Sequence, residues 1–306
     1  MRVITPLPSG TQHHLHHGDQ EAVVAEVGAS LRLYRVGGRD VVRPYDEGVL
    51  TPAFSGALLA PWPNRLADGR YGFEGSVYQV PVTEVDRMTA LHGLVGHERF
   101  TAAGPREDEA SVTLQHDLVP TGGYPWPLLI TVTFTLSDAG LECTVTALNQ
   151  GSSTAPYGVG VHPWLSTGGA AVDDCSLSVG ASRHVTVDNR LLPTGTEPVA
   201  NQFDLRQARS LAGLALDDAW VGVLRDDDER TWATLGRPDG STVAMWGDAA
   251  TTAWQVCTGD QVARIGRTAV AVEPMSCVAD AFRTGDDLVR LEPGQEHVLR
   301  WGLQLR

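Results

Sequence analysis

The feature that most constrains the fold of this chain is a strict alternation of apolar and polar residues between positions 128 and 148. In LLITVTFTL, at 128–136, the even-numbered residues are all apolar, whereas three of the four odd-numbered residues are threonine. The turn-forming residues SDAG follow, and LECTVTAL at 141–148 resumes the alternation. Because successive side chains of a strand point to opposite faces, this pattern predicts a β-hairpin with one buried face.

Similar strand-like runs recur along the chain, and helical periodicity is rare. The further runs are SLRLYRV, SVTLQHDL, STVAMW, TAWQVC, TAVAVE and HVLRWGLQL, and most of the 33 glycines and 18 prolines lie between such runs, where turns need them. One helix is expected, at 204–214, with Asp204 as its N-cap. Many short strands without regular β-α alternation predict an all-β fold, a large antiparallel β-sandwich that forms a single domain over residues 1–306.

Composition and charge narrow the possible partners. Hydrophobic residues make up 42% of the chain and the formal net charge is −14, so no basic stripe is available to bind nucleic acid. No stretch approaches the ~18 apolar residues of a membrane span, and the N-terminus does not read as a secretory signal, so we expect a cytoplasmic protein without membrane contact.

Neither a metal nor a cofactor is expected. The four cysteines, Cys143, Cys175, Cys257 and Cys277, lack metal-ligand spacing and are interpreted as buried thiols. The histidines at positions 13, 14, 16 and 17 are interpreted as a solvated segment or turn in preference to a metal site.

Two ionisable residues stand where apolar runs end. His162 lies in GVGVHPWL, directly before Pro163, and Glu273 follows AVAV and precedes Pro274. A carboxylate that leaves an apolar strand is partly desolvated, which makes it a stronger base, and proline is expected to end the strand there. For His162 the alternative is a hydrogen-bonded histidine of the core.

Several blocks, taken in order, resemble the aldose 1-epimerases, also called galactose mutarotases: PNRLADGRYGFEGSVYQV, LHG, GVGVHPWL, LDDAW, WQVCTGD and VEPMSCVADAF. The resemblance implies a galactose-mutarotase-like sandwich with a sugar cleft across one sheet. It also implies that Glu273 is the general base and His162 the general acid. Arg65, His92 and Asp217 match the family positions that hold sugar hydroxyls or the ring oxygen, and His92 is able to share the acid's task.

The match has departures that bear on the site. Many members have asparagine before the acid histidine and tyrosine-phenylalanine after the proline, where this chain has Val161, Trp164 and Leu165. The run HGLVGHERF is closer to a less-characterised bacterial branch. Asp218 adjoins Asp217 and is an alternative for the aspartate. Asn64 is a further substrate-binding candidate, and Trp164 is expected either to stack on a sugar or to belong to the core.

The function expected from the resemblance is interconversion of the α and β anomers of an aldose by ring opening and reclosure. We expect a small sugar as the partner, with the carboxylate of Glu273 and the imidazole of His162 facing each other across the width of one pyranose. A carbohydrate-binding domain without catalysis is one alternative. A glycoside hydrolase that uses Glu273 and Asp217 is another.

Overall fold

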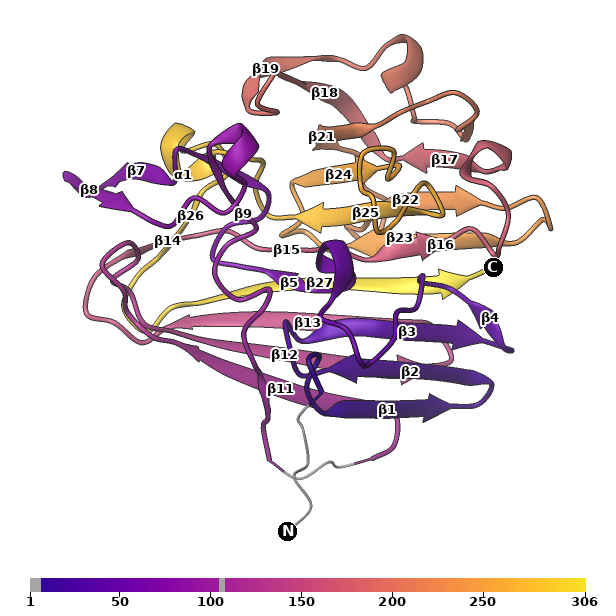
Figure 1. Ribbon diagram of the computed structural model, residues 1–306, viewed down its shortest axis with the longest axis horizontal. Helices are drawn as coiled ribbons and strands as arrows, with labels where there is room; N and C mark the ends of the chain where they lie inside the picture. Colours follow the sequence, from indigo (N-terminus) through magenta and orange to yellow (C-terminus); the bar gives the residue numbers. More distant parts are fainter. Residues whose placement is uncertain (1–6, 105–107) are drawn as a thin grey trace.

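The computed structural model describes residues 7–104 and 108–306, and it is built almost entirely from strands. Every pairing between named strands is antiparallel, and two large sheets dominate the molecule (Figure 1). The predicted antiparallel β-sandwich is thereby confirmed. Within the described residues, helical structure is limited to α1 (Ala281–Thr284) and four 3-10 turns, which are η1 (Pro52–Phe54), η2 (Val85–Arg87), η3 (Val172–Asp174) and η4 (Asn201–Phe203).

The larger sheet has nine strands and contains the hairpin from which the sequence analysis began. In spatial order its strands are β10 (Thr101–Ala102), β11 (Ser111–Leu118), β12 (Leu128–Ser137), β13 (Gly140–Asn149), β27 (Glu296–Leu305), β23 (Thr242–Gly247), β22 (Thr231–Gly236), β17 (Ser176–Val179) and β20 (Arg209–Ser210).

The second sheet has eight strands and carries most of the candidate site. Its order is β19 (Pro193–Pro198), β18 (Ala181–Val187), β21 (Asp217–Val223), β24 (Ala253–Cys257), β25 (Ala269–Met275), β15 (Gly160–Val161) and β5 (Leu58–Leu59), and β16 (Trp164–Ser166) pairs with β25 beside β15.

Four smaller sheets complete the fold. The first has four strands in sequence order, β1 (Gln12–His17), β2 (Gln20–Ala25), β3 (Ser30–Val36) and β4 (Arg39–Asp40); the others are the pairs β6 (Arg65–Ala67) with β9 (Thr89–Leu91), β7 (Arg70–Phe73) with β8 (Ser76–Gln79), and β14 (Ala155–Tyr157) with β26 (Val289–Leu291).

The predicted hairpin is present, with β12 paired to β13 from Leu128↔Asn149 to Ser137↔Gly140. The five apolar residues at even positions of 128–136 are between 0% and 2% exposed. Of the intervening threonines, Thr131 and Thr133 face threonines of β13, and Thr135 faces Glu142. The C-terminal strand β27 lies between β13 and β23, so strands distant in sequence are neighbours in one sheet (Figure 1). The alternation therefore marks the face that packs into the core.

The helix expected at 204–214 is absent, and this prediction was wrong. The segment contains β20, and η4 ends just before it. Leu205 and Leu211, which suggested helical spacing, are 1% and 0% exposed. Their backbone groups bond to residues at the two ends of β17, with the N–H of Val179 donating to Leu205 and the N–H of Leu211 donating to Cys175. Pairing with a sheet edge thus buries the same leucines that a helix was expected to bury.

The N-terminal histidines lie in strand β1, which pairs with β2, so the turn alternative was wrong, whereas His14 and His16 are exposed to solvent as expected of a solvated segment. Leu15, the one apolar residue of this strand, is fully buried. Histidine obscured the alternation, since its intermediate polarity marks neither face clearly.

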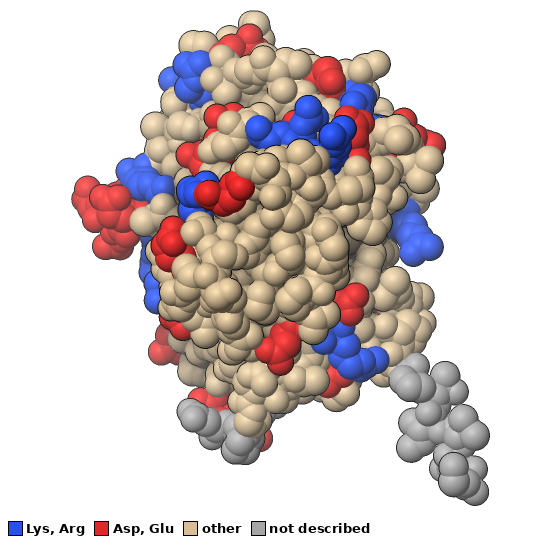
Figure 2. All heavy atoms as spheres, turned by 90° about the vertical axis from the view of Figure 1, so that its left-hand side faces the viewer, with Lys and Arg blue, Asp and Glu red and all other residues tan. Residues whose placement is uncertain are grey.

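No helix among the described residues is long and apolar enough to cross a membrane. Figure 2 shows the face that lies at the left of Figure 1, where basic and acidic side chains are interspersed around a broad area of other residues. Basic side chains lie next to one another in the upper part of this face, flanked by acidic ones (Figure 2).

Candidate functional site

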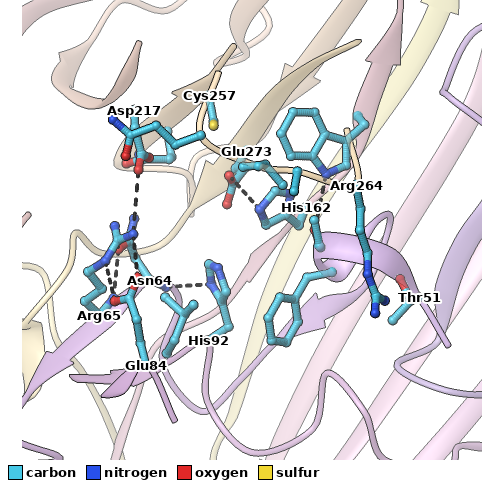
Figure 3. Close-up of a pocket in the computed structure, with 18 of the residues that line it drawn as sticks. Thr51, Asn64, Arg65, Glu84, His92, His162, Asp217, Cys257, Arg264 and Glu273 are labelled. Carbon is cyan, nitrogen blue, oxygen red and sulfur yellow. Dashed lines mark hydrogen bonds and ion pairs between the residues drawn. The ribbon is translucent and has the colours of Figure 1, made fainter. Parts of the chain in front are cut away.

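The candidate site is a pocket of about 540 Å³ on one face of the eight-stranded sheet. Strand register determines which residues form the floor of the pocket. Asp217 pairs with Cys257, and Gln255 pairs with Glu273, across adjacent strands. Cys257 is two residues from Gln255, so all four side chains project from the same face. The register of β21, β24 and β25 therefore brings three polar side chains and one thiol together (Figure 3).

Glu273 and His162 lie at the centre of this pocket. Glu273 is 1% exposed and His162 is 7% exposed, and the distance from Glu273 Oε1 to His162 Nε2 is 3.3 Å. They face the same space, as expected, but they are in direct contact instead of standing a pyranose width apart. Both groups are buried, so a polar partner close by offsets part of the cost of removing each from water.

Burial shifts both groups toward their neutral forms. It lowers the pKa of His162 from 6.5 to about 4. It also raises the pKa of Glu273 well above its ordinary value, with the nearby Asp217 carboxylate adding to the rise. Glu273 Oε2 and His162 Nδ1 have no hydrogen-bond partner among the described residues. The favoured pair is thus a carboxyl group beside a neutral imidazole, between which one proton is able to move.

The strand that carries Glu273 does not end where it was expected to end. β25 continues through Pro274 to Met275. The register places the break between β15 and β16, at His162 and Pro163, alongside Glu273 and Val272, and places Pro274 opposite Val161 at the end of β15. The N–H groups of Val272 and Ser276 donate to Pro163 and Val159, so the N–H that the proline lacks falls between them, where β15 already ends.

His92 follows β9 and enters the pocket from the other wall. Its Nδ1 accepts a hydrogen bond from the backbone N–H of Asn64 at 3.2 Å, which assigns the ring proton to Nε2. Burial, and to a lesser extent the neighbouring His162, lowers the pKa of His92 well below its ordinary value. His92 is therefore a neutral ring with one N–H available to a ligand.

Arg65 begins β6, beside the strand that precedes His92, and is 8% exposed. Its guanidinium contacts two carboxylates, Glu84 at 2.9 Å through Nε and Asp217 at 3.6 Å through Nη2. Asn64, which was proposed as a sugar ligand, instead uses its Oδ1 to accept hydrogen bonds from the backbone N–H and Nη1 of Arg65. Asn64 thus lines the pocket while it orients Arg65.

The choice between the two aspartates is settled by strand alternation. Asp217 lines the pocket and accepts a hydrogen bond from the Gln255 side chain at 2.8 Å. Asp218 points to the opposite face, where its Oδ1 lies 2.9 Å from Nε2 of His184. Burial raises the pKa of Asp217, although Arg65 opposes the rise.

Trp164 lines the pocket but is only 1% exposed, which favours the core alternative over sugar stacking. Its Nε1–H donates to the carbonyl of Ala53 at 3.2 Å. Ala53 and Phe54 both have positive φ, 47° and 53°, in the left-handed region that non-glycine residues seldom adopt. Trp164 therefore holds a strained turn that places the Phe54 ring 4.7 Å from the ring of His92.

Some pocket residues were not found from the sequence. Gln255 had a signal, since it is the one polar side chain inside the apolar run AWQVC, whereas Glu84 and Phe54 lie in turns without a pattern. Cys257, expected to be buried, is partly exposed and lines the pocket. Within residues 7–104 and 108–306, no three His, Cys, Asp or Glu side chains gather as metal ligands would.

Comparison with known proteins shows the family of this chain. The sequence model of the family described as aldose 1-epimerase matches residues 11–304. The uncharacterized protein YihR of Escherichia coli (strain K12) is 33% identical over 296 residues, which cover 95% of this chain and 92% of YihR. Galactose mutarotase of Rattus norvegicus is 32% identical over 162 residues, half of this chain and 46% of the rat protein.

Solved structures share the fold at lower identity. The GalM/aldose epimerase homologue from C. elegans has a TM-score of 0.84 at 18% identity and covers 97% of this chain and 98% of its own. Galactose 1-epimerase from Lactobacillus acidophilus NCFM has a TM-score of 0.79 at 17% identity, with coverage of 95% and 93%. Since the family's sequence model spans nearly the whole chain, this protein belongs to the aldose 1-epimerase family.

Proposed function

We propose that this protein is an aldose 1-epimerase that interconverts the α and β anomers of an aldose sugar. Glu273 acts as the general base at the anomeric hydroxyl, and His162 acts as the general acid at the ring oxygen. Arg65, His92 and Asp217 bind the sugar. Membership of the family supports the reaction class, and the convergence of these five residues in one pocket supports the assignment of roles.

The observation that carries the proposal is the buried contact of Glu273 with His162, at 3.3 Å, together with a Glu273 oxygen that has no hydrogen-bond partner among the described residues. Burial favours the neutral pair, and the reactive form arises when the proton of the Glu273 carboxyl group moves to His162, which leaves Glu273 ionised. Glu273 takes the proton of O1 while His162 gives its proton to O5, so the C1–O5 bond breaks and the free aldehyde forms. The pair still holds one proton, which is now on the carboxyl group.

Burial makes this transfer favourable for the protein. Before ring opening the pair carries two charges, whereas afterwards both side chains are neutral, as their opposite pKa shifts favour. Rotation about C1–C2 exposes the other face of the aldehyde, and reclosure returns both protons. No electron or group is transferred to the protein. His92 Nε2–H is placed to donate to the ring oxygen as well, which would leave some activity when His162 is replaced.

The test is acceleration of anomer exchange. Fresh α-galactose and α-glucose are followed by polarimetry, and a wider panel of aldoses by NMR exchange spectroscopy, with and without the protein. Faster exchange of at least one aldose is expected. Sugar binding without faster exchange would favour a carbohydrate-binding domain, and release of nitrophenol from a nitrophenyl glycoside would favour a hydrolase; either result would refute the proposal.

A further inference from the structure

Glu84 is a partly buried carboxylate in the pocket that the proposed mechanism does not use. It lies between β8 and η2, outside the large sheets, and its side chain is 16% exposed. Figure 3 shows it beneath Arg65, on the side away from Asp217. A carboxylate without a chemical role at such a position needs a physical explanation.

The carboxylate of Glu84 accepts two hydrogen bonds from the guanidinium of Arg65. Glu84 Oε2 accepts from Arg65 Nε at 2.9 Å, and Glu84 Oε1 accepts from Arg65 Nη2 at 3.2 Å. Two parallel charge-assisted bonds of this kind fix the plane of a guanidinium as well as its position. The geometry therefore removes the freedom of Arg65 to rotate about its last side-chain bonds.

Glu84 is itself held in place from three directions. The hydroxyl of Thr89 donates to Oε2 at 2.7 Å, and Arg87 Nη1 donates to Oε1 at 2.9 Å. The backbones of Glu84 and Thr89 also exchange two hydrogen bonds, of 2.9 and 3.1 Å. Burial alone would raise the pKa of Glu84, but the bonds from Arg65 and Thr89 outweigh it and hold the pKa below the ordinary value. The carboxylate is therefore ionised and rigid.

The donors of Arg65 are almost fully assigned. A guanidinium has five N–H groups. The Nε–H and one Nη2–H bind Glu84, one Nη1–H binds Asn64 Oδ1 at 3.3 Å, and the other Nη2–H faces Asp217 Oδ2 at 3.6 Å. One Nη1–H has no acceptor among the described residues, and the Asp217 contact is long enough to yield to a ligand. Arg65 therefore offers donors in a fixed direction.

We propose that Glu84 is a positioning residue of the sugar site, which holds the guanidinium of Arg65 away from Asp217 so that both groups remain available to sugar hydroxyls. This inference rests on the proposed function, because it assigns a sugar to the pocket. Without Glu84, Asp217 is the only carboxylate within 4 Å of Arg65 among the described residues. The two sugar-binding groups would then pair with each other at the expense of the ligand.

The first test compares Glu84→Gln with a matched control, Glu26→Gln. Glu26 is also a half-buried carboxylate, 14% exposed, that pairs with an arginine, Arg99, and it lies outside the residues that line the pocket. For Glu84→Gln we expect KM to rise about 10- to 100-fold, the effect of losing charge-assisted hydrogen bonds, with kcat and its pH limbs unchanged. Glu26→Gln is expected to keep the wild-type KM. Equal KM values for all three proteins would overturn the inference.

A double-mutant cycle separates positioning from a general structural effect. If Glu84 acts through Arg65, Glu84→Gln adds little to the KM change in the Arg65→Lys background, whereas independent effects multiply. The Nε–H resonance of Arg65 gives a signature without any sugar, since slow exchange with solvent is expected in the wild type and fast exchange in Glu84→Gln. If Glu84→Gln does not fold, the same measurements are made on Glu84→Asp, which keeps the charge but has a shorter side chain.

Failure of the proposed function is distinguishable from failure of this inference. If the wild type binds an aldose but does not speed its anomer exchange, the proposed function is wrong. Glu84 is then tested by the dissociation constant from an NMR titration with galactose in place of KM. If the wild type neither binds nor converts any aldose of the panel, both proposals are refuted.

Discussion

Replacement of Glu273 by glutamine is the sharpest test of the proposed chemistry. Glutamine has nearly the same shape, so it fits a site where Glu273 is 1% exposed, but its amide cannot take a proton from a sugar hydroxyl. A positioned general base contributes about 10²–10⁴-fold to a rate, which corresponds to about 3–5 kcal/mol of activation free energy. Because burial strengthens this base, we expect a loss in the upper half of that range for kcat/KM.

The same substitution, which lowers activity, should raise the thermal stability of the folded chain relative to the wild type as the pH rises. The pKa of Glu273 is raised above its ordinary value of 4.5 in the folded chain, so the folded state holds this proton more tightly than the unfolded state. The resulting stabilisation is fully present below the unfolded pKa and is lost as the pH rises through the folded pKa. Glutamine stays neutral, so Tm of Glu273→Gln minus Tm of the wild type should increase between pH 5 and pH 8.

Two measurements check these expectations. Polarimetry on fresh α-galactose gives kcat/KM, and thermal unfolding followed by circular dichroism at several pH values gives the Tm difference. A Glu273→Gln protein that retains activity within twofold of the wild type would show that Glu273 is not the base. A Tm difference that shrinks as the pH rises would contradict the burial argument.

The remaining predictions concern other residues of the pocket. Because the pKa of His162 falls from 6.5 to about 4 on folding, stability should be lost as the pH falls from 7 to 4, by about 3 kcal/mol in urea unfolding, and His162→Asn should remove this component. His162→Asn should also retain measurable anomer exchange through His92, and complete inactivity would exclude a shared acid. Arg65→Lys loses the two-point contact with Glu84 and should raise KM about 10-fold. Trp164→Phe removes the hydrogen bond to Ala53 and should cost about 1 kcal/mol in urea unfolding with little change in KM; a large KM change would restore Trp164 as a sugar ligand.

Two residues of the site were predictable from the strand pattern, and Arg65, His92 and Asp217 were expected from the resemblance to the family. Glu273 and His162 are ionisable groups next to apolar runs, and the structure places both in one pocket with Arg65, His92 and Asp217. The direct contact between the first two was not predicted, since the sequence gives no distance between residues 111 positions apart. That distance depends on β15 and β16 both pairing with β25.

The residues that sequence reasoning missed share one property, which is that their role depends on a neighbour from elsewhere in the chain. Glu84 has a role only through its contact with Arg65. Phe54 is positioned by a turn to which Trp164 donates a hydrogen bond. The helix expected at 204–214 failed for the same reason, since apolar spacing does not say whether a helix or a sheet edge will bury the leucines.

By itself, the sequence determined much of the local structure: the hairpin at 128–148 with its buried face, several further strands, and a fold built from antiparallel strands. Alternation in 128–148 was sufficient for the hairpin, because side-chain direction in a strand has a period of two whatever the partner. Only the tertiary structure decided which strands are neighbours, and therefore that Asp217, Gln255 and Glu273 share a face. The physical reason is that alternation encodes the orientation of a side chain but not the identity or register of the strand beside it.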